Sequence, residues 1–237
     1  MGAGEALIRY KEVEVHQQEL CVLSDVNLEL HKGEFVYLVG KVGSGKTSLL
    51  KTFYAELDVT SGEAEVLGYD MVRIKRKHIP PLRRKLGIVF QDFQLLTDRT
   101  VYENLEFVLR ATGWKNRNEM KDRINEVLEL VGMNNKGYKL PNELSGGEQQ
   151  RIVIARAVLN SPEIILADEP TGNLDVETGR AITELLHSLS ESGSLVIMTT
   201  HNLQLLREYP GRVYRCMEHR LVDATAEYAA PAWTEGK

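Results

Sequence analysis

The sequence predicts an α/β protein in which a mainly parallel sheet is covered by helices. Two observations indicate this class. From residue 145 to residue 222, short apolar strands alternate with helical segments, a pattern typical of parallel sheets. Earlier in the chain, a glycine-rich loop follows the apolar run 35–39 and precedes a helical segment. This strand, loop and helix are expected to belong to the same sheet.

Composition limits the function classes. With 237 residues, 43% of them hydrophobic, the chain can form one large domain with a substantial core. A net charge of −5 argues against a general nucleic-acid binder. No secretory signal and no apolar run of membrane-spanning length is present. Cys21 and Cys216 lack the spacing of metal or redox motifs, which favours two reduced core thiols in the cytosol.

The first thirty residues alternate apolar and polar side chains, which predicts half-exposed antiparallel strands beside the loop. Ser61 and Gly62 then break the chain before a short strand at 63–68. The basic stretch 73–85 contains no acid and favours a solvated face over an anionic-lipid contact. A buried strand at 85–90 ends at Gln91.

Between residues 93 and 140 the periodicity becomes helical. Thr100 and Glu103 form a predicted capping box that opens one helix. A second helix carries apolar residues on one face from Met120 to Val131. Arg99 and Tyr102, in the segment 92–103 that follows Gln91, belong to residue types enriched at interfaces and are expected to contact a membrane partner.

The remaining elements follow in order from Ser145. Helices are expected from Ser145, Asp175 and Asn202, and strands at 163–167 and 195–199. A hairpin is expected at 212–222, followed by a loose tail at 223–237. We expect one domain at 1–222, with residues 93–157 forming a helical subdomain between two core segments, 1–92 and 158–222.

The glycine-rich loop matches G-x-x-x-x-G-K-[ST], whose backbone N–H groups surround nucleotide phosphates. Lys46 is expected to reach the β- and γ-phosphates, and the Thr47 hydroxyl to ligate Mg²⁺. The predicted ATP-binding residues are Gly40, Lys41, Val42, Gly43, Ser44, Gly45, Lys46, Thr47 and Ser48.

Chemistry is expected where the strands end, because ligands of open α/β sheets bind at the carboxyl ends of strands. Asp168 follows an apolar strand and is expected to hold Mg²⁺ together with Thr47 and Gln91. Glu169 is expected to polarise the attacking water. Gln91 and His201 end two further strands, where they could sense the metal and the γ-phosphate.

A second candidate phosphate site is formed by Ser145, Gly146, Gly147 and Glu148. The local interpretation is a capping box for the helix that follows. Two glycines in a first turn nevertheless cost about 1 kcal/mol each relative to alanine, which favours close approach of a phosphate. One nucleotide has one γ-phosphate, so the second site is predicted to close over the nucleotide of another copy in a head-to-tail homodimer.

Together, the loop at 40–47, Gln91, the stretch 144–150, the run 167–170 and His201 resemble the nucleotide-binding domain of ABC ATPases. The resemblance implies a RecA-like P-loop NTPase core, an antiparallel β-subdomain and an inserted helical subdomain. It also implies ATP and Mg²⁺ as ligands, with Asp175 contributing from the second subunit. An aromatic adenine platform is expected near residue 17, where this chain offers His16 and Val22 instead.

The strings 98–104, 145–151 and 167–175 resemble the cell-division branch of that family. This resemblance implies an integral membrane partner of the permease type, no nucleic acid, and peripheral attachment at the cytoplasmic face of the plasma membrane. The alternative within the family is a lipoprotein-releasing or macrolide-export ATPase. A DNA-associated ATPase and a non-catalytic scaffold are disfavoured, the first by the absence of a long coiled-coil insertion and the second by intact Lys46, Asp168 and Glu169.

Overall fold

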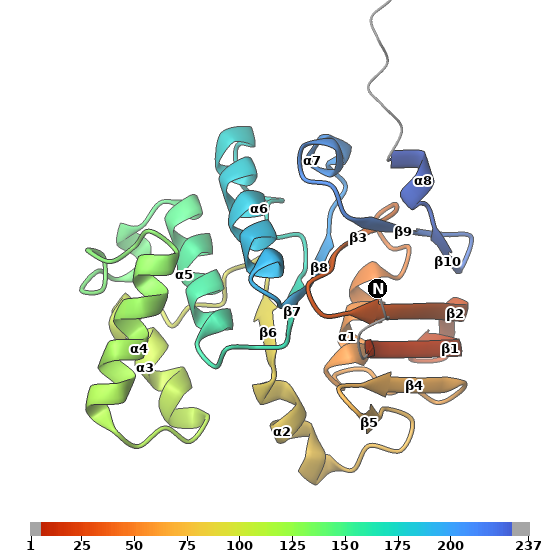
Figure 1. Ribbon diagram of the computed structural model, residues 1–237, viewed down its shortest axis with the longest axis horizontal. Helices are drawn as coiled ribbons and strands as arrows, with labels where there is room; N and C mark the ends of the chain where they lie inside the picture. The colour runs from red at the N-terminus through yellow and green to blue at the C-terminus, as the bar shows by residue number, and fades with distance from the viewer. Residues whose placement is uncertain (1–5, 229–237) are drawn as a thin grey trace, which may run out of the picture.

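The computed structural model describes residues 6–228, which form two sheets and a block of helices (Figure 1). The larger sheet contains β3 (Phe35–Val39), β6 (Leu86–Val89), β7 (Ile164–Ala167), β8 (Leu195–Thr199), β9 (Arg212–Met217) and β10 (Arg220–Asp223). The smaller sheet contains β1 (Ala6–Gln17), β2 (Leu20–His31), β4 (Glu63–Val66) and β5 (Tyr69–Asp70).

The larger sheet has the strand order β10-β9-β3-β8-β7-β6. All of its pairs are parallel except the hairpin of β9 and β10. The smaller sheet is antiparallel, in the order β2-β1-β4-β5. The predicted α/β class with an antiparallel sheet beside the core is therefore confirmed.

The helices connect and cover these sheets (Figure 1). They are α1 (Lys46–Phe53), α2 (Ile79–Arg84), α3 (Val101–Ala111), α4 (Arg117–Leu130), α5 (Gly146–Val158), α6 (Val176–Glu191), α7 (Leu203–Glu208) and α8 (Thr225–Tyr228). Two short 3₁₀ segments are η1 (Arg76–His78) and η2 (Pro141–Glu143). No helix among residues 6–228 is both long and apolar enough to cross a membrane.

The two faces of β3 belong to two different hydrophobic cores. Phe35 and Tyr37 pack into a core shared with α3 to α6, whereas Val36 and Leu38 pack into a core shared with α1 and the antiparallel sheet. Successive side chains of a strand point to opposite faces, so an uninterrupted apolar strand can serve both cores. Its carboxyl end, where the glycine-rich loop begins, is consequently held from both sides.

The β1–β2 pairing is irregular near its turn. Val15 pairs with Leu23 and His16 pairs with Cys21, which leaves Val22 as the extra residue of a β-bulge. Gln17 pairs with Leu20, so the turn consists of two residues. The bulge and the turn both lie next to the nucleotide loop, as described below.

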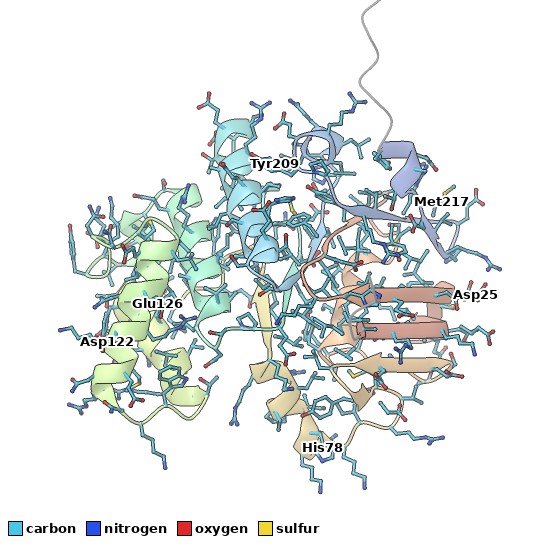
Figure 2. All side chains as sticks on the ribbon, viewed as in Figure 1. Asp25, His78, Asp122, Glu126, Tyr209 and Met217 are labelled. Atoms are coloured by element: carbon cyan, nitrogen blue, oxygen red, sulfur yellow. The ribbon has the colours of Figure 1, made fainter. Side chains whose placement is uncertain are left out.

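The helical block α3–α5 lies between β6 and β7 in the chain and at one end of the molecule (Figure 1). Its predicted start is confirmed, because Thr100 and Glu103 form both bonds of a capping box. Buried Asn104 donates to the carbonyl oxygens of Leu96 and Arg99 and so fixes the approach to α3. The polar face of α4, which includes Asp122 and Glu126, points outward (Figure 2).

Some elements differ from the sequence expectation. The basic stretch contains η1 and α2, which were not predicted; Pro80 and Pro81 lie in the first turn of α2, a position where proline is tolerated. The predicted tail begins with Asp223 at the end of β10 and the short helix α8. The rest of the predicted tail, 229–237, lies outside the described residues.

Candidate nucleotide site

The glycine-rich loop forms one wall of a cavity of about 470 Å³ at the carboxyl end of the parallel sheet. From the loop and α1, Val42, Gly43, Gly45, Lys46, Thr47, Ser48 and Lys51 line this cavity. Gln91, Asp168 and Glu169 from neighbouring strand ends close it, and Gln17 and Val22 reach it from the β1–β2 hairpin.

Glycine is required at position 45 for backbone reasons. Its φ of +97° lies in the left-handed region, and a Cβ there would lie 2.9 Å from Cγ of Leu23. Gly45 therefore has a structural role besides the predicted approach of a phosphate. Without a Cβ at this position, α1 can begin close against Leu23 of β2.

Lys46 closes the loop on itself. Its ammonium donates to the carbonyl oxygens of Gly40 (2.9 Å) and Lys41 (3.1 Å), and the side chain is buried. Among the described residues, Ser44 Oγ is buried and finds no hydrogen-bond partner. A buried hydroxyl without a partner is costly, and an anion cradled by the loop would supply one.

Three oxygens meet where β7 and β8 end. Asp168 Oδ1 accepts hydrogen bonds from Thr47 Oγ1 (3.2 Å) and from Thr199 Oγ1 (2.7 Å). The Thr199 hydroxyl in turn accepts from the backbone N–H of Glu169 (2.7 Å). Thr199 therefore joins the two neighbouring acids into one network. Hydroxyl and carboxylate oxygens are ligands that Mg²⁺ prefers, so Thr47 and Asp168 fit the predicted metal role.

Glu169 adopts a strained backbone conformation, with φ of 45°. Such a conformation is uncommon for a residue other than glycine and is frequently found at functional sites. Its carboxylate lies 3.3 Å from Nδ1 of His201, which is 65% exposed. Glu169 also lines a second cavity of about 160 Å³, together with His201 and Asp175. Glu169 and His201, predicted separately from the ends of two strands, thus lie side by side.

Gln91 lies two residues after the end of β6. Its side chain is exposed and lines the nucleotide cavity together with Glu169. Its backbone oxygen accepts from Asn173 Nδ2 (3.4 Å). A Cβ on Gly172 would lie 3.1 Å from Gln91 Nε2. The side chain thus lies between the segment after Glu169 and the nucleotide cavity.

The second predicted phosphate site lies apart from this cavity, since no residue of α5 lines it among those the structure describes. Ser145 Oγ accepts from the N–H of Glu148 (3.3 Å), and the Glu148 carboxylate accepts from the N–H of Ser145 (2.9 Å). The latter bond lowers the pKa of Glu148, with a further contribution from Lys136. The capping-box interpretation of this stretch is therefore confirmed.

The two glycines of this stretch have different surroundings. A Cβ on Gly147 would lie 2.4 Å from Cγ2 of Thr178, at the start of α6. A Cβ on Gly146 would make an ordinary contact with Leu174 (3.4 Å). Helix packing thus gives a reason for the glycine at 147 besides the predicted approach of a phosphate.

Asp175 caps α6. Its carboxylate accepts from the N–H of Thr178 (2.9 Å) and from the Thr178 hydroxyl (2.6 Å), and these bonds lower its pKa. The carboxylate is exposed at the rim of the smaller cavity. The residue is therefore positioned by its own helix and remains accessible to a second copy.

The two candidate residues for the adenine platform, His16 and Val22, have different surroundings. Val22 is buried and lines the nucleotide cavity, and Gln17, which is exposed, lines it too. His16 Nε2 instead lies 3.0 Å from Oε2 of Glu14. The ring is thus engaged with the neighbouring residue of its own strand.

Sequence reasoning missed Thr199, Gln17 and Lys51. Thr199 is fully buried at the end of an apolar strand, and a polar residue in that position was the available signal. Lys51 lies one turn beyond Thr47 on α1, which places both on one helix face. The position of Gln17 at the cavity follows from the hairpin register, which the sequence does not give.

Comparison with known proteins agrees with this geometry. A family model described as "ABC transporter" matches residues 23–172. The Cell division ATP-binding protein FtsE of Streptococcus pneumoniae is 43% identical over 208 residues, 87% of this chain and 90% of that protein. FtsE of Mycobacterium tuberculosis is 44% identical over 200 residues, 84% and 86% of the respective chains.

Among solved structures, the dimeric structure of MJ0796, a bacterial ABC transporter cassette, is similar with a TM-score of 0.80 and 34% identity. The match covers 90% of this chain and 96% of that one. A second MJ0796 structure, described as a post-hydrolysis state bound to ADP and Pi, matches with a TM-score of 0.79 and 34% identity. It too covers 90% of this chain and 96% of that one.

Proposed function

The chain belongs to the ABC transporter family and is an ABC-type ATPase, and from this premise we propose that it is the FtsE-like subunit of a cell-division complex. In this role it would bind ATP with Mg²⁺ and act on a membrane partner at the cytoplasmic face of the plasma membrane. The similarity to FtsE proteins over most of both chains carries the proposal.

The residues at the strand ends can divide the hydrolytic work. The loop N–H groups and Lys46 would bind the phosphates, and Mg²⁺, held by Thr47, Asp168 and Gln91, would neutralise phosphate charge. Glu169 would accept a hydrogen bond from the attacking water and orient it. His201, 3.3 Å from that carboxylate, would hold Glu169 in place and reach toward the γ-phosphate.

We propose that ATP binding forms a homodimer in which Ser145, Gly146, Gly147, Glu148 and Asp175 reach the partner's nucleotide. The separation of the α5 N-terminus from the nucleotide cavity of its own chain supports this arrangement. The dimeric state of MJ0796 gives further support. A shared site explains why both phosphate-binding stretches occur in one chain.

The membrane partner is proposed to be an FtsX-like permease that docks in a groove of about 430 Å³ between α2, β6, α3 and α5. The groove is lined by apolar side chains together with Arg83, Arg84 and Arg156, which suits an amphipathic segment with acidic residues. Its lining residues are Ile79, Pro80, Arg83, Arg84, Leu86, Ile88, Val108, Ala111, Thr112, Arg156, Ala157 and Asn160.

Arg156 connects this groove to the nucleotide. It lines the groove, and its guanidinium donates to the carbonyl oxygens of Phe93 and Gln94, just after Gln91. A shift of Gln91 on ATP binding would therefore be transmitted to the groove wall. Arg99, by contrast, lies over the Phe107 ring, and Tyr102 packs against the helical core. We therefore place docking in the groove rather than at Arg99 and Tyr102.

The test is capture by two candidate permeases produced in membranes: an FtsX-like protein and a lipoprotein-releasing permease. We expect capture by the first and not by the second, and Ala111→Glu should reduce capture at least about tenfold by placing a charge in the groove. Leu130→Glu, at an exposed position on α4 outside the groove, is the control. Preferential capture by the lipoprotein-releasing permease would favour the alternative transport role.

A further inference from the structure

The end of the β1–β2 hairpin brings together three side chains that are common metal ligands. One carboxylate oxygen of Glu14, one ring nitrogen of His16 and Sγ of Cys21 all lie within 4.8 Å of one another. Glu14 and His16 are two residues apart on β1 and so share a face, while Cys21 pairs directly with His16 across the hairpin. The strand register therefore sets the three donors on one side of the hairpin.

We propose that Glu14, His16 and Cys21 form a binding site for a thiophilic divalent cation, with Zn²⁺ as the best match. Zinc binds carboxylate, imidazole and thiolate donors at about 2.0–2.3 Å in a tetrahedron, which separates the donors by about 3.3–3.7 Å. His16 Nε2 and Glu14 Oε2 are already 3.0 Å apart. A small rotation of the side chains would open the space for the ion.

The donor set decides which cation is bound. A thiolate ligand favours zinc and related soft cations over Mg²⁺, which prefers oxygen. Binding replaces the Cys21 thiol hydrogen bond to the carbonyl oxygen of Leu23 (3.3 Å) and releases the thiol proton to solvent. The neutral imidazole binds through Nε2 and keeps its proton on Nδ1. Three protein ligands leave the fourth position open to water or to an outside ligand.

The contacts that these residues make within the protein explain their combination less well than a bound metal ion does. The pair of Glu14 and His16 is partly exposed, and exposed pairs contribute little to stability. Cys21 is half-buried, and its thiol donates a hydrogen bond to the carbonyl oxygen of Leu23 on its own strand. The three side chains come from two strands and are different in chemistry, which is what a mixed-ligand zinc site requires.

The site adjoins the nucleotide cavity, a step that rests on the proposed ATP binding. Val22 follows Cys21 in the bulge and Gln17 follows His16, and both line the nucleotide cavity. A cation that joins His16 to Cys21 would fix the strand segments that carry both residues. Ordering them in advance removes part of the cost of binding, so ATP affinity should rise about two- to tenfold.

Cobalt titration tests the site on the reduced, metal-free full chain. We expect one Co²⁺ per chain, with a thiolate-to-cobalt charge-transfer band that Zn²⁺ abolishes. Cys21→Ser should remove the band, and Glu14→Gln and His16→Gln should weaken binding at least about tenfold.

Cys216→Ser and His78→Gln are matched controls that should keep the band. Cys216 is buried, and burial raises the pKa of its thiol to about 11, so it should remain protonated. His78 lies on the separate segment η1 (Figure 2). A band that survives Cys21→Ser, or cobalt binding without a thiolate band, would overturn the proposal.

A second measurement does not depend on the folding of variants. Zinc should protect Cys21 of the unmodified protein from alkylation, read out by peptide mass analysis, at concentrations that saturate the cobalt-displacement curve. Unprotected Cys21 under these conditions would also overturn the proposal.

ATP affinity, measured in excess Mg²⁺ with and without one equivalent of zinc, tests the coupling to the nucleotide. A two- to tenfold increase that is lost in Cys21→Ser would support it. An unchanged affinity with an intact cobalt band would overturn the coupling alone. Absence of ATP binding in both states would instead contradict the proposed function and leave the metal site standing.

Discussion

The Thr199 side chain bonds to both neighbouring acids at the sheet edge. Its hydroxyl donates to Asp168 and accepts from the N–H of Glu169, so it fixes the direction of one carboxylate and the backbone of the other. The backbone of Glu169 is in the left-handed region, and a hydrogen bond there helps to hold it. We regard Thr199 as a positioning residue for hydrolysis.

Replacement of Thr199 by valine, which has nearly the same shape, should lower the free energy of unfolding by about 1–3 kcal/mol, because the Glu169 N–H loses its partner. The ATPase rate should fall about ten- to hundredfold as the acids lose alignment. Urea unfolding and steady-state ATPase measure the two effects. Thr199→Ser keeps the hydroxyl and should restore most of the rate. A purely packing role would give the opposite order, with the valine variant near normal and the serine variant, which lacks the methyl group, impaired.

Glu169→Gln should keep ATP binding and lose hydrolysis by about 10²–10⁴, since the amide cannot accept the proton of the attacking water in the same way. Phosphate and metal contacts should be unaffected, because they involve other side chains. Nucleotide binding and turnover are measured on one preparation. Near-normal turnover would remove Glu169 from the proposed role.

For single residues, the sequence predicts which side chains lie at the carboxyl ends of the strands. Asp168, Glu169, Gln91 and His201 do lie together at that edge of the parallel sheet. The sequence does not predict the partner of each side chain, because Thr199 and Asp168 are 31 residues apart. The spacing of Cys21 indicates no metal site for the same reason, because its neighbours His16 and Glu14 are known only from the hairpin register.

Among the elements, α5 and α6 are in close contact at the proposed dimer surface. Gly147 lies against Thr178, and Asp175 holds that threonine by two hydrogen bonds. Packing of α5 on α6 and presentation of Ser145 and Asp175 are therefore linked in one contact. Helix packing and phosphate binding are separable reasons for glycine at this position.

Gly147→Ala should destabilise the fold by about 1–3 kcal/mol, because the new methyl group overlaps Thr178 Cγ2. Adding Thr178→Ser removes that methyl group, keeps the hydroxyl bond to Asp175, and should restore stability. If Gly147 also approaches a phosphate, the double variant should still fail to dimerise with ATP. Thermal unfolding and sedimentation distinguish these effects, and full recovery of both would reduce Gly147 to a packing role.

Elements that begin at caps were predicted well. Thr100, Ser145, Asp175 and Asn202 each cap the helix expected after them, because capping is a local property. The short helix α2 has no side-chain cap and only one buried residue, so its sequence carries little helical signal. Tertiary contacts, such as those of Arg83 with the carbonyl oxygens of Tyr54 and Ala55, hold it instead.

For the whole molecule, the proposed shared site predicts that association depends on the γ-phosphate. Glu169→Gln with MgATP should sediment as a dimer, and the ADP form as a monomer, because nucleotide that binds the dimer better shifts association by mass action. Ser145→Arg in the same background should prevent the dimer. Equal masses with ATP and ADP, or a dimer that survives Ser145→Arg, would contradict the shared site.

The strand order also determines when the larger sheet can assemble during translation. β3 comes early in the chain, yet its two neighbours, β8 and β9, are the strands at 195–199 and 212–217. A ribosome adding about 5–20 residues per second would need roughly 10–35 s to supply them after β3. During that interval α3 to α5 can already pack with one another, while β3 waits without strand partners. The nucleotide site is therefore among the last parts of the molecule to be completed during translation.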